Sequence, residues 1–262
     1  MVLLSFLVVT GCSRRDILDD YPVSGVEVRL DWSGVTEKLP EGVRIIFYPK
    51  DEKGRKIDTY LSVTGGEVKV PSGHYAVVIY NYDTETVLIR GEEFYETIQA
   101  YTNFCKLGIA GTEKMVWGPD PLYVVNIDDL DIQNSEETLI LKLKPKLVIR
   151  TYSFSIKVQG LSNVSNVIGS IGGMADHYFL GKAYAMCDDY PINIDLNVKA
   201  GKIEGVFTTF GLPEAIITRL EIKLPVMMNL MIIKVDNSVQ EVKINITEAV
   251  QEPTGGGEGG EG

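Results

Sequence analysis

The sequence predicts an all-β protein made of two tandem antiparallel β-sandwich domains, and three observations lead to this prediction. Apolar residues recur at every second position in both halves of the 262-residue chain, which is the period of a half-buried strand. Short segments that contain Gly, Pro, Asp or Asn separate these runs, as turns between antiparallel strands do. The sequence shows no long helical pattern, so it does not predict an α/β enzyme core.

The first eleven residues, MVLLSFLVVTG, are almost wholly apolar but too short to cross a bilayer, which takes about 20 residues. Their length suits the apolar region of a secretory signal, although no Lys or Arg precedes it. Val9-Thr10-Gly11-Cys12 is similar to a bacterial lipobox, in which small residues flank the bond that a lipoprotein signal peptidase cuts. The alternative is a buried first strand with a core cysteine. We predict cleavage before Cys12 and attachment of two or three acyl chains to this residue, which gives stable anchoring.

The segment after Cys12 leads into the predicted first sandwich. Residues 12–25 are polar and lack a sustained period, which predicts a tether. Strands of the first sandwich, residues 26–136, are expected in VEVRLDW, VRIIFYP, IDTYLSV, EVKVPSGHYAVVIYNYD, ETVLIRG and LYVVNI. EEFYETIQAYTNF, residues 92–104, is interpreted as a short helix or an irregular crossing. WGPDP, residues 117–121, is predicted to be a loop because prolines are excluded from central strands.

The acidic segment DDLDIQNSEE, residues 128–137, is interpreted as a solvated interdomain connection. The second sandwich is predicted over residues 137–252. Its strands are expected in TLILKLKPKLVIRTYSFSIKV, INIDLNVKAGKIEGVFTTFG and TRLEIKLPVMMNLMIIKVDNSVQEVKINIT. VMMNLMI, residues 226–232, is apolar on both faces, which predicts a strand covered on both sides. Residues 253–262, PTGGGEGGEG, are predicted to be a disordered tail because they have almost nothing to bury.

Charge and composition exclude several classes of function. The formal net charge of −11 disfavours nucleic acid, which requires clustered Lys and Arg. With two histidines and three cysteines, the chain is not expected to form a zinc cluster. The sequence contains neither a phosphate-binding loop nor a nucleophile elbow. We therefore predict no catalytic residue, no cofactor and no metal site.

His177 follows Asp176 in MADHYF, and this pair was weighed as an acid and a base. Neighbouring residues of a strand point to opposite faces, so the two are not expected to orient each other. His177 is instead predicted to lie on the surface near a turn, as is His74. Cys105 and Cys187 are predicted to be either two buried free thiols or a disulfide that joins the two domains.

Acidic residues in the interdomain segment raise the question of calcium binding. Asp128, Asp129 and Asp131 lie close together in the sequence, but the spacing and central glycine of an EF-hand loop are missing. A solvated acidic segment is therefore the favoured interpretation.

Several segments together resemble the fimbrillin-like lipoproteins of the Bacteroidales, a family that contains minor and anchor subunits of type V fimbriae. They are the Cys12 motif, VRLDWSG followed by PEGVRIIFYPKDEKG, VKVPSGHYAVVIYNYDTETV, VQGLSNVSNV leading to GSIGGMADHYFLG, and VFTTFGLP. The resemblance spans about residues 12–252. It implies two transthyretin-like sandwiches, a lipid anchor in the outer membrane at the cell surface, and a role in adhesion or fimbria assembly. It implies no catalytic residues.

Two functions from different classes follow. The first is a lipid-anchored subunit in which an edge or end of a sandwich receives a strand of another fimbrial subunit. The second is a surface lipoprotein that captures a ligand such as a glycan, because sugars stack on exposed aromatic faces. Trp32 is in phase with a core face, which leaves Trp117 as the predicted ligand contact.

Overall fold

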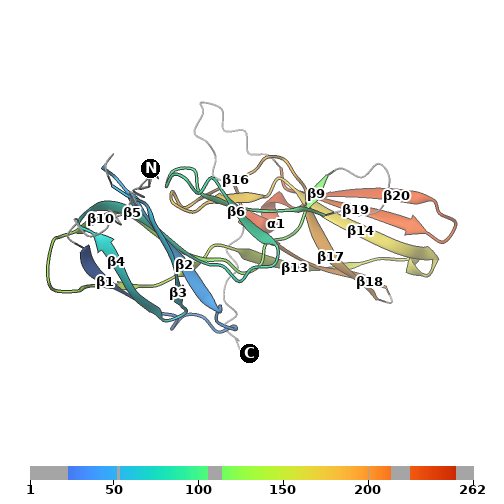
Figure 1. Cartoon of the computed structure of the whole chain (residues 1–262). Coiled ribbons are helices and arrows are strands. Elements are labelled where there is room, and N and C mark those ends of the chain that lie inside the picture. Colours follow the sequence, from blue (N-terminus) through green and yellow to red (C-terminus); the bar gives the residue numbers. More distant parts are fainter. Residues whose placement is uncertain (1–22, 52–53, 106–113, 200, 214–224, 252–262) are drawn as a thin grey trace, which may run out of the picture.

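A computed structural model describes residues 23–51, 54–105, 114–199, 201–213 and 225–251, and these residues are almost entirely β (Figure 1). Within these ranges twenty strands form three sheets, and the α-helix α1 (Thr247–Gln251) is five residues long. No helix in the same ranges is long and apolar enough to cross a membrane. The predicted all-β class is thus confirmed. Residues 12–22 of the predicted tether and the whole predicted tail lie outside the described residues, but residues 23–25 belong to strand β1 and not to a tether, because they pair with β4.

The first sheet has eight strands. Its order is β11 (Leu139–Leu143), β1 (Val23–Leu30), β4 (Gly65–Pro71), β3 (Ile57–Ser62), β2 (Gly42–Pro49), β5 (Gly73–Asn81), β10 (Tyr123–Ile132) and β12 (Lys146–Leu147). Pairing is antiparallel except between β1 and β11, which run parallel. Apolar residues of β1, β2, β4, β5 and β10 pack against partly buried leucines of β11, so the sheet curls around one hydrophobic core.

The second sheet has six strands on its main path. Its order is β13 (Arg150–Lys157), β18 (Lys202–Thr209), β17 (Ile192–Lys199), β14 (Val164–Gly172), β19 (Met227–Lys234) and β20 (Val239–Asn245). The short strand β9 (Met115–Val116) runs parallel to β17 and pairs with β8 (Phe104–Cys105), and the 3-10 turn η2 (Leu161–Asn163) precedes β14. This sheet encloses a second core, to which Val250 of α1 also belongs.

The third sheet has four strands and draws on distant parts of the chain. Its order is β16 (Tyr184–Met186), β15 (His177–Phe179), β7 (Gln99–Thr102) and β6 (Val87–Arg90). β15 pairs with β7, so a strand from the second half of the chain extends a hairpin from the first. The predicted division between residues 136 and 137 stays a prediction. In the structure β11 and β12, which follow it, hydrogen-bond to strands of the first sheet.

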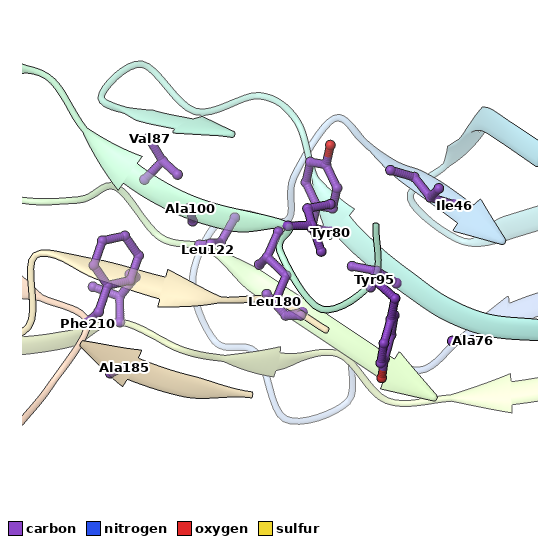
Figure 2. Close-up of a cluster of buried hydrophobic side chains, with 14 of the residues drawn as sticks. Ile46, Ala76, Tyr80, Val87, Tyr95, Ala100, Leu122, Leu180, Ala185 and Phe210 are labelled. Carbon is purple, nitrogen blue, oxygen red and sulfur yellow. The ribbon is translucent and has the colours of Figure 1, made fainter. Parts of the chain in front are cut away.

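A third core lies between the first and third sheets. Figure 2 shows Leu180, Ala185 and Phe210 in the same cluster as Val87 and Ala100. Strands β2 and β5 contribute side chains to two cores. Consecutive side chains of a strand point to opposite faces, so one face of each strand packs into this third core and the other face packs into the core of the first sheet. This is why IIFY, residues 45–48, and YAVVIY, residues 75–80, are continuous apolar runs rather than alternating ones.

Three interpretations of the sequence need comment. Residues 92–104 do not form the short helix that was one of the two interpretations. The segment begins with turns, and its end forms β7 and β8, which pair with β15 and β9. The first five residues of DDLDIQNSEE, residues 128–132, are not a connection, because they continue β10 past a register shift between Ile127 and Leu130. The strand predicted to be covered on both faces, β19, is fully buried on one face at Met228 and Leu230 but only partly covered on the other, where Met227 is half-buried.

Candidate functional site

The second sheet ends on two strands whose outer edges offer unpaired backbone groups. β13 pairs with β18 in an uninterrupted antiparallel register, from Arg150 opposite Thr209 to Lys157 opposite Lys202. β20 pairs with β19 alone. Within the described ranges no strand pairs with the other edge of β13 or of β20. Both edges therefore have the hydrogen-bonding capacity to receive a further strand.

The direction of the backbone groups along β13 follows from one hydrogen bond. The Val158 amide donates to the Gly201 carbonyl oxygen at 3.0 Å, directly after the last pair of the register. In an antiparallel pair, alternate residues face the partner strand. The amides and carbonyls of the even-numbered residues of β13 therefore face β18, and those of Thr151, Ser153 and Ser155 face away from the sheet.

Apolar side chains continue up to this edge without being fully covered. Tyr152, Phe154 and Ile156 all point into the core of the second sheet, yet each is only partly buried. The Tyr152 ring stacks on Phe207 with centroids 5.1 Å apart. The Phe154 ring occupies the space above Gly205, where an added Cβ would clash with it. The core is thus well packed inside and open towards the β13 edge.

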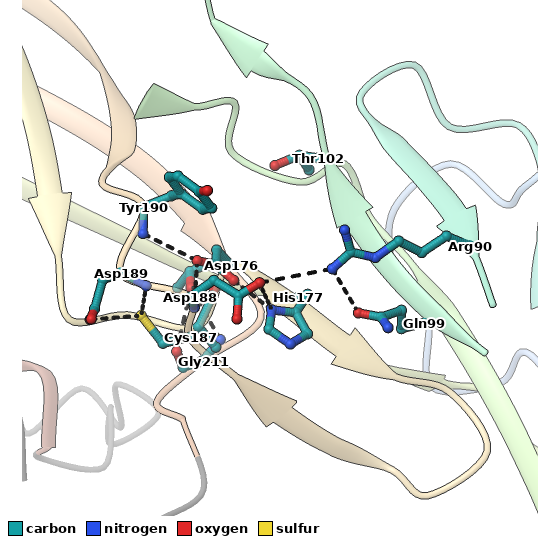
Figure 3. Close-up of polar contacts among 12 residues, drawn as sticks. Arg90, Gln99, Thr102, Asp176, His177, Cys187, Asp188, Asp189, Tyr190 and Gly211 are labelled. Atoms are coloured by element: carbon teal, nitrogen blue, oxygen red, sulfur yellow. Dashed lines mark hydrogen bonds and ion pairs between the residues drawn. The ribbon is translucent and has the colours of Figure 1, made fainter. Parts of the chain in front are cut away.

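A polar cluster lies where the third sheet meets the second (Figure 3). His177 is only 4% exposed, and its Nδ1 lies 2.6 Å from Asp176 Oδ1. Asp176 Oδ2 accepts hydrogen bonds from the backbone amides of Asp188, at 2.9 Å, and Tyr190, at 3.3 Å. The predicted surface position of His177 is therefore wrong. Asp176 precedes β15, so the alternation of strand side chains does not separate the two residues.

The donor atoms of Asp176, His177 and Asp188 all lie within 4.8 Å of one another, so by distance they could hold a metal ion. Both carboxylate oxygens of Asp176, however, already accept hydrogen bonds, and the exposed Asp188 lies 3.9 Å from both His177 Nδ1 and Arg90 Nη2. These contacts give the cluster a structural role, because Asp176 accepts backbone hydrogen bonds from the segment between β16 and β17.

Trp117, the predicted ligand contact, directly follows β9 and is 40% exposed. Its backbone is fixed by two hydrogen bonds: its amide donates to the Asn103 carbonyl oxygen at 3.0 Å, and its carbonyl oxygen accepts from Thr102 Oγ1 at 2.6 Å. Two more exposed aromatic residues, Phe104 and Tyr190, pack edge to face with centroids 5.0 Å apart beside β9 and β17. Trp32, by contrast, packs against the first core, as predicted. Its Nε1 also donates a hydrogen bond to the Val63 carbonyl oxygen.

A cavity of about 180 Å³ lies beside the first sheet, lined in part by Asp31, Glu37, Lys144 and Tyr123. Tyr123 is the aromatic residue in its wall and is only 6% exposed. The cavity therefore offers no open ring face on which a sugar could stack, and it adds nothing to the glycan hypothesis.

The cysteines divide between described and undescribed parts of the chain. Cys12 lies outside the described residues, so its lipidation stays a prediction. Cys105 and Cys187 are free thiols, the first buried and the second partly so, which favours the free-thiol interpretation over the disulfide. Burial is the main cause that raises the pKa of Cys187 to about 11. A backbone hydrogen bond from Asp189 lowers this pKa and nearby carboxylates raise it further, and the net result is a thiol that is protonated at neutral pH.

The three sheets define an all-β protein. A family model described as "Domain of unknown function (DUF5119)" matches residues 11–195. The chain is 51% identical, over its whole length and 82% of the relative, to the "Putative fimbrium anchoring subunit Fim4B" of Bacteroides ovatus. The chain therefore belongs to the DUF5119 family and, as its resemblance implied, to the fimbrillin-like proteins of the Bacteroidales.

Two solved structures show the same fold. The first, described as "a putative adhesin" of Bacteroides ovatus, is 52% identical, with a TM-score of 0.82 over 93% of this chain and 89% of the other. The second is the fimbrial anchor protein Mfa2 of Porphyromonas gingivalis, which is 13% identical, with a TM-score of 0.56 over 87% of this chain and 83% of that one. At this low identity, the likeness to Mfa2 concerns the fold alone.

Proposed function

We propose that this chain is a non-catalytic surface lipoprotein that serves fimbriae as an anchor, accessory or adhesion subunit and holds a partner subunit through a sheet edge. The observation that carries the proposal is the second sheet, whose apolar core side chains reach the β13 edge, where no strand of the described residues pairs. Membership in a family with a fimbrium anchoring relative supports a fimbria-related role and a place at the cell envelope.

The physical argument rests on strand addition. A visiting strand gains a row of backbone hydrogen bonds at an open edge, and its alternate side chains extend the core below. Acyl chains on Cys12 would hold the body at the outer membrane, so that one added strand would attach the partner to the surface as well. This mode of binding needs neither a cofactor nor a catalytic group.

The test is made on the full chain, expressed in its own bacterium and purified from the outer membrane. We expect Cys12 to be the acylated N-terminal residue by mass spectrometry, and fimbrial subunits to be recovered with the protein. A Cys12→Ala variant should leave the outer-membrane fraction. Recovery of the intact protein without fimbrial subunits would contradict the proposed function, and an unmodified Cys12 would contradict the anchor.

A glycan-binding function is the second candidate, and the exposure of Trp117 is the observation that favours it. Its fixed backbone would present the indole to a sugar ring at little further cost in entropy. On a glycan array, this function predicts specific retention that Trp117→Ala removes. The control Phe94→Ala, which truncates another exposed aromatic residue, should not reduce retention. Equal binding by wild type and Trp117→Ala would exclude Trp117 as the contact.

A further inference from the structure

We infer that β13, rather than β20, is the edge that receives the partner. We further infer that the occupant is an extended protein segment with apolar residues at alternate positions and an acidic residue beside Lys157. This inference rests on the proposed function and specifies the site and the chemistry of its partner. Four features of the described residues carry it.

The first feature is that β13 lacks the devices that block edge pairing. Between its terminal Arg150 and Lys157 it contains no charged residue and no proline, and its register with β18 has no bulge. The residues whose backbone faces outward there are Thr151, Ser153 and Ser155, which are small and polar. Natural sheets protect exposed edges with charges, prolines or bulges, and this edge has none of these along its middle.

The second feature is the contrast with β20. The Ile246 amide donates to the Val226 carbonyl oxygen, so even-numbered residues of β20 face β19 and odd-numbered ones face outward. Two of the outward residues are Glu241 and Lys243, which form an exposed ion pair at 3.2 Å. A strand that paired with β20 would crowd this pair of long charged side chains, so β20 carries the protection that β13 lacks.

The third feature is the pattern of side chains along β13. Tyr152, Phe154 and Ile156 lie on the core face and are half-buried, while the intervening Thr151, Ser153 and Ser155 are exposed on the other face. A strand added beside β13 would place its own alternate side chains against the half-buried face. Apolar residues at these positions would complete the cover, and polar residues at the intervening positions would face solvent. Eight paired residues span roughly 26 Å.

The fourth feature is a pair of positive charges at the end of this edge, of which only Lys202 has a carboxylate, that of Glu204, near enough to interact with it. Lys157 and Lys202 are directly opposite each other, an arrangement that destabilises a strand pair. In the described part of the chain neither lysine forms an ion pair, although the chain as a whole has a formal net charge of −11. A carboxylate of the partner at this end would neutralise the pair and fix the register of the added strand.

The test compares variants of the full chain in its own bacterium, with recovery of identified fimbrial subunits as the readout. Ser155→Pro removes an outward amide and places a ring in the path of the partner, without breaking the bonds to β18. We expect recovery to fall by about ten-fold or more, because a backbone hydrogen bond is lost and the neighbouring ones are strained. The matched controls Ser155→Ala and Lys243→Pro should retain the wild-type recovery.

A second variant and a second measurement guard against a folding defect in Ser155→Pro. Lys157→Glu changes only an exposed side chain, and we expect it to lower recovery several-fold at low salt. In the wild-type complex, hydrogen exchange should show protection of the amides of Thr151, Ser153 and Ser155 relative to the free protein. Unprotected amides in a complex that contains fimbrial subunits would overturn the inference.

The outcomes separate this inference from the proposed function. If wild type recovers fimbrial subunits and Lys243→Pro loses them while Ser155→Pro does not, β13 is the wrong edge and the proposed function stands. If wild type recovers no fimbrial subunit, the proposed function fails and this inference fails with it. Loss in Ser155→Pro and Lys157→Glu, with both controls intact and the β13 amides protected, supports both.

Discussion

Replacing Leu180 by alanine tests whether the core between the first and third sheets joins the two halves of the chain. Leu180 is 0% exposed and belongs to the same buried cluster as Ile46 and Tyr80 (Figure 2). Its amide donates to the Ile98 carbonyl oxygen at 3.0 Å, which ties the backbone in place. The substitution removes apolar contacts made by the second half of the chain to residues of the first half.

The expected cost lies in the upper part of the usual range. A buried Leu→Ala change costs about 2–5 kcal/mol, and more when the site cannot collapse around the cavity. Here the next residue, Gly181, packs so closely that a Cβ would clash with the Tyr95 carbonyl oxygen, so the backbone has no room to move inward. We therefore expect a loss of about 3–5 kcal/mol, which for a chain of this size lowers the Tm by roughly 6 °C or more.

Thermal and urea unfolding, each followed by circular dichroism and tryptophan fluorescence, measure this loss. Because the cluster contains residues of both halves, the two probes should report one coincident transition in wild type and in Leu180→Ala. The matched control is Leu212→Ala, at a leucine that is 36% exposed, and it should cost less than about 1 kcal/mol. Equal losses for the two variants would refute the assignment of Leu180 to a shared core. Two separate transitions would refute the joining of the halves.

Four further predictions concern three single sites. Asp176→Asn should lower the free energy of unfolding, measured in urea, by about 2–4 kcal/mol because three hydrogen-bond donors lose a charged acceptor. The control Asp188→Asn, at an exposed carboxylate, should change the free energy of unfolding little. Equal effects of the two substitutions would contradict the structural role of the buried Asp176. At pH 8 the Cys187 thiol should be alkylated roughly 100-fold more slowly in the folded than in the urea-unfolded chain, because its folded pKa is raised to about 11, and comparable rates would contradict its burial. The same raised pKa should make stability fall as the pH rises from about 9 to 11, because the unfolded thiol ionises first and thus binds fewer protons. Gly205→Ala should destabilise by about 1–3 kcal/mol because the new Cβ displaces the Phe154 ring, and a neutral effect would show that the edge of the second sheet can adjust.

The sequence by itself determined the class of fold and most of the strands. A two-residue period is a property of each strand alone, so the alternation in VEVRLDW or RTYSFSIK predicts β1 and β13 without knowledge of their neighbours. The core-facing position of Trp32 also followed from the local pattern, whereas Trp117 was identified by elimination. The structure of segment 92–104 was harder to predict from the sequence, because the strands β7 and β8 are only four and two residues long, too short to establish a period.

Only the tertiary structure decided which strands lie side by side. β7 and β15 are more than seventy residues apart, and nothing in either segment specifies the other, because backbone hydrogen bonds are the same for every sequence. For the same reason the sequence could not distinguish the open edge at β13 from the strands paired on both sides. The contact between Asp176 and His177 likewise depended on where β15 begins, which its pairing with β7 and β16 sets. The local pattern thus fixed which residues face a core, and the long-range pairing fixed which core they face and which edges remain free.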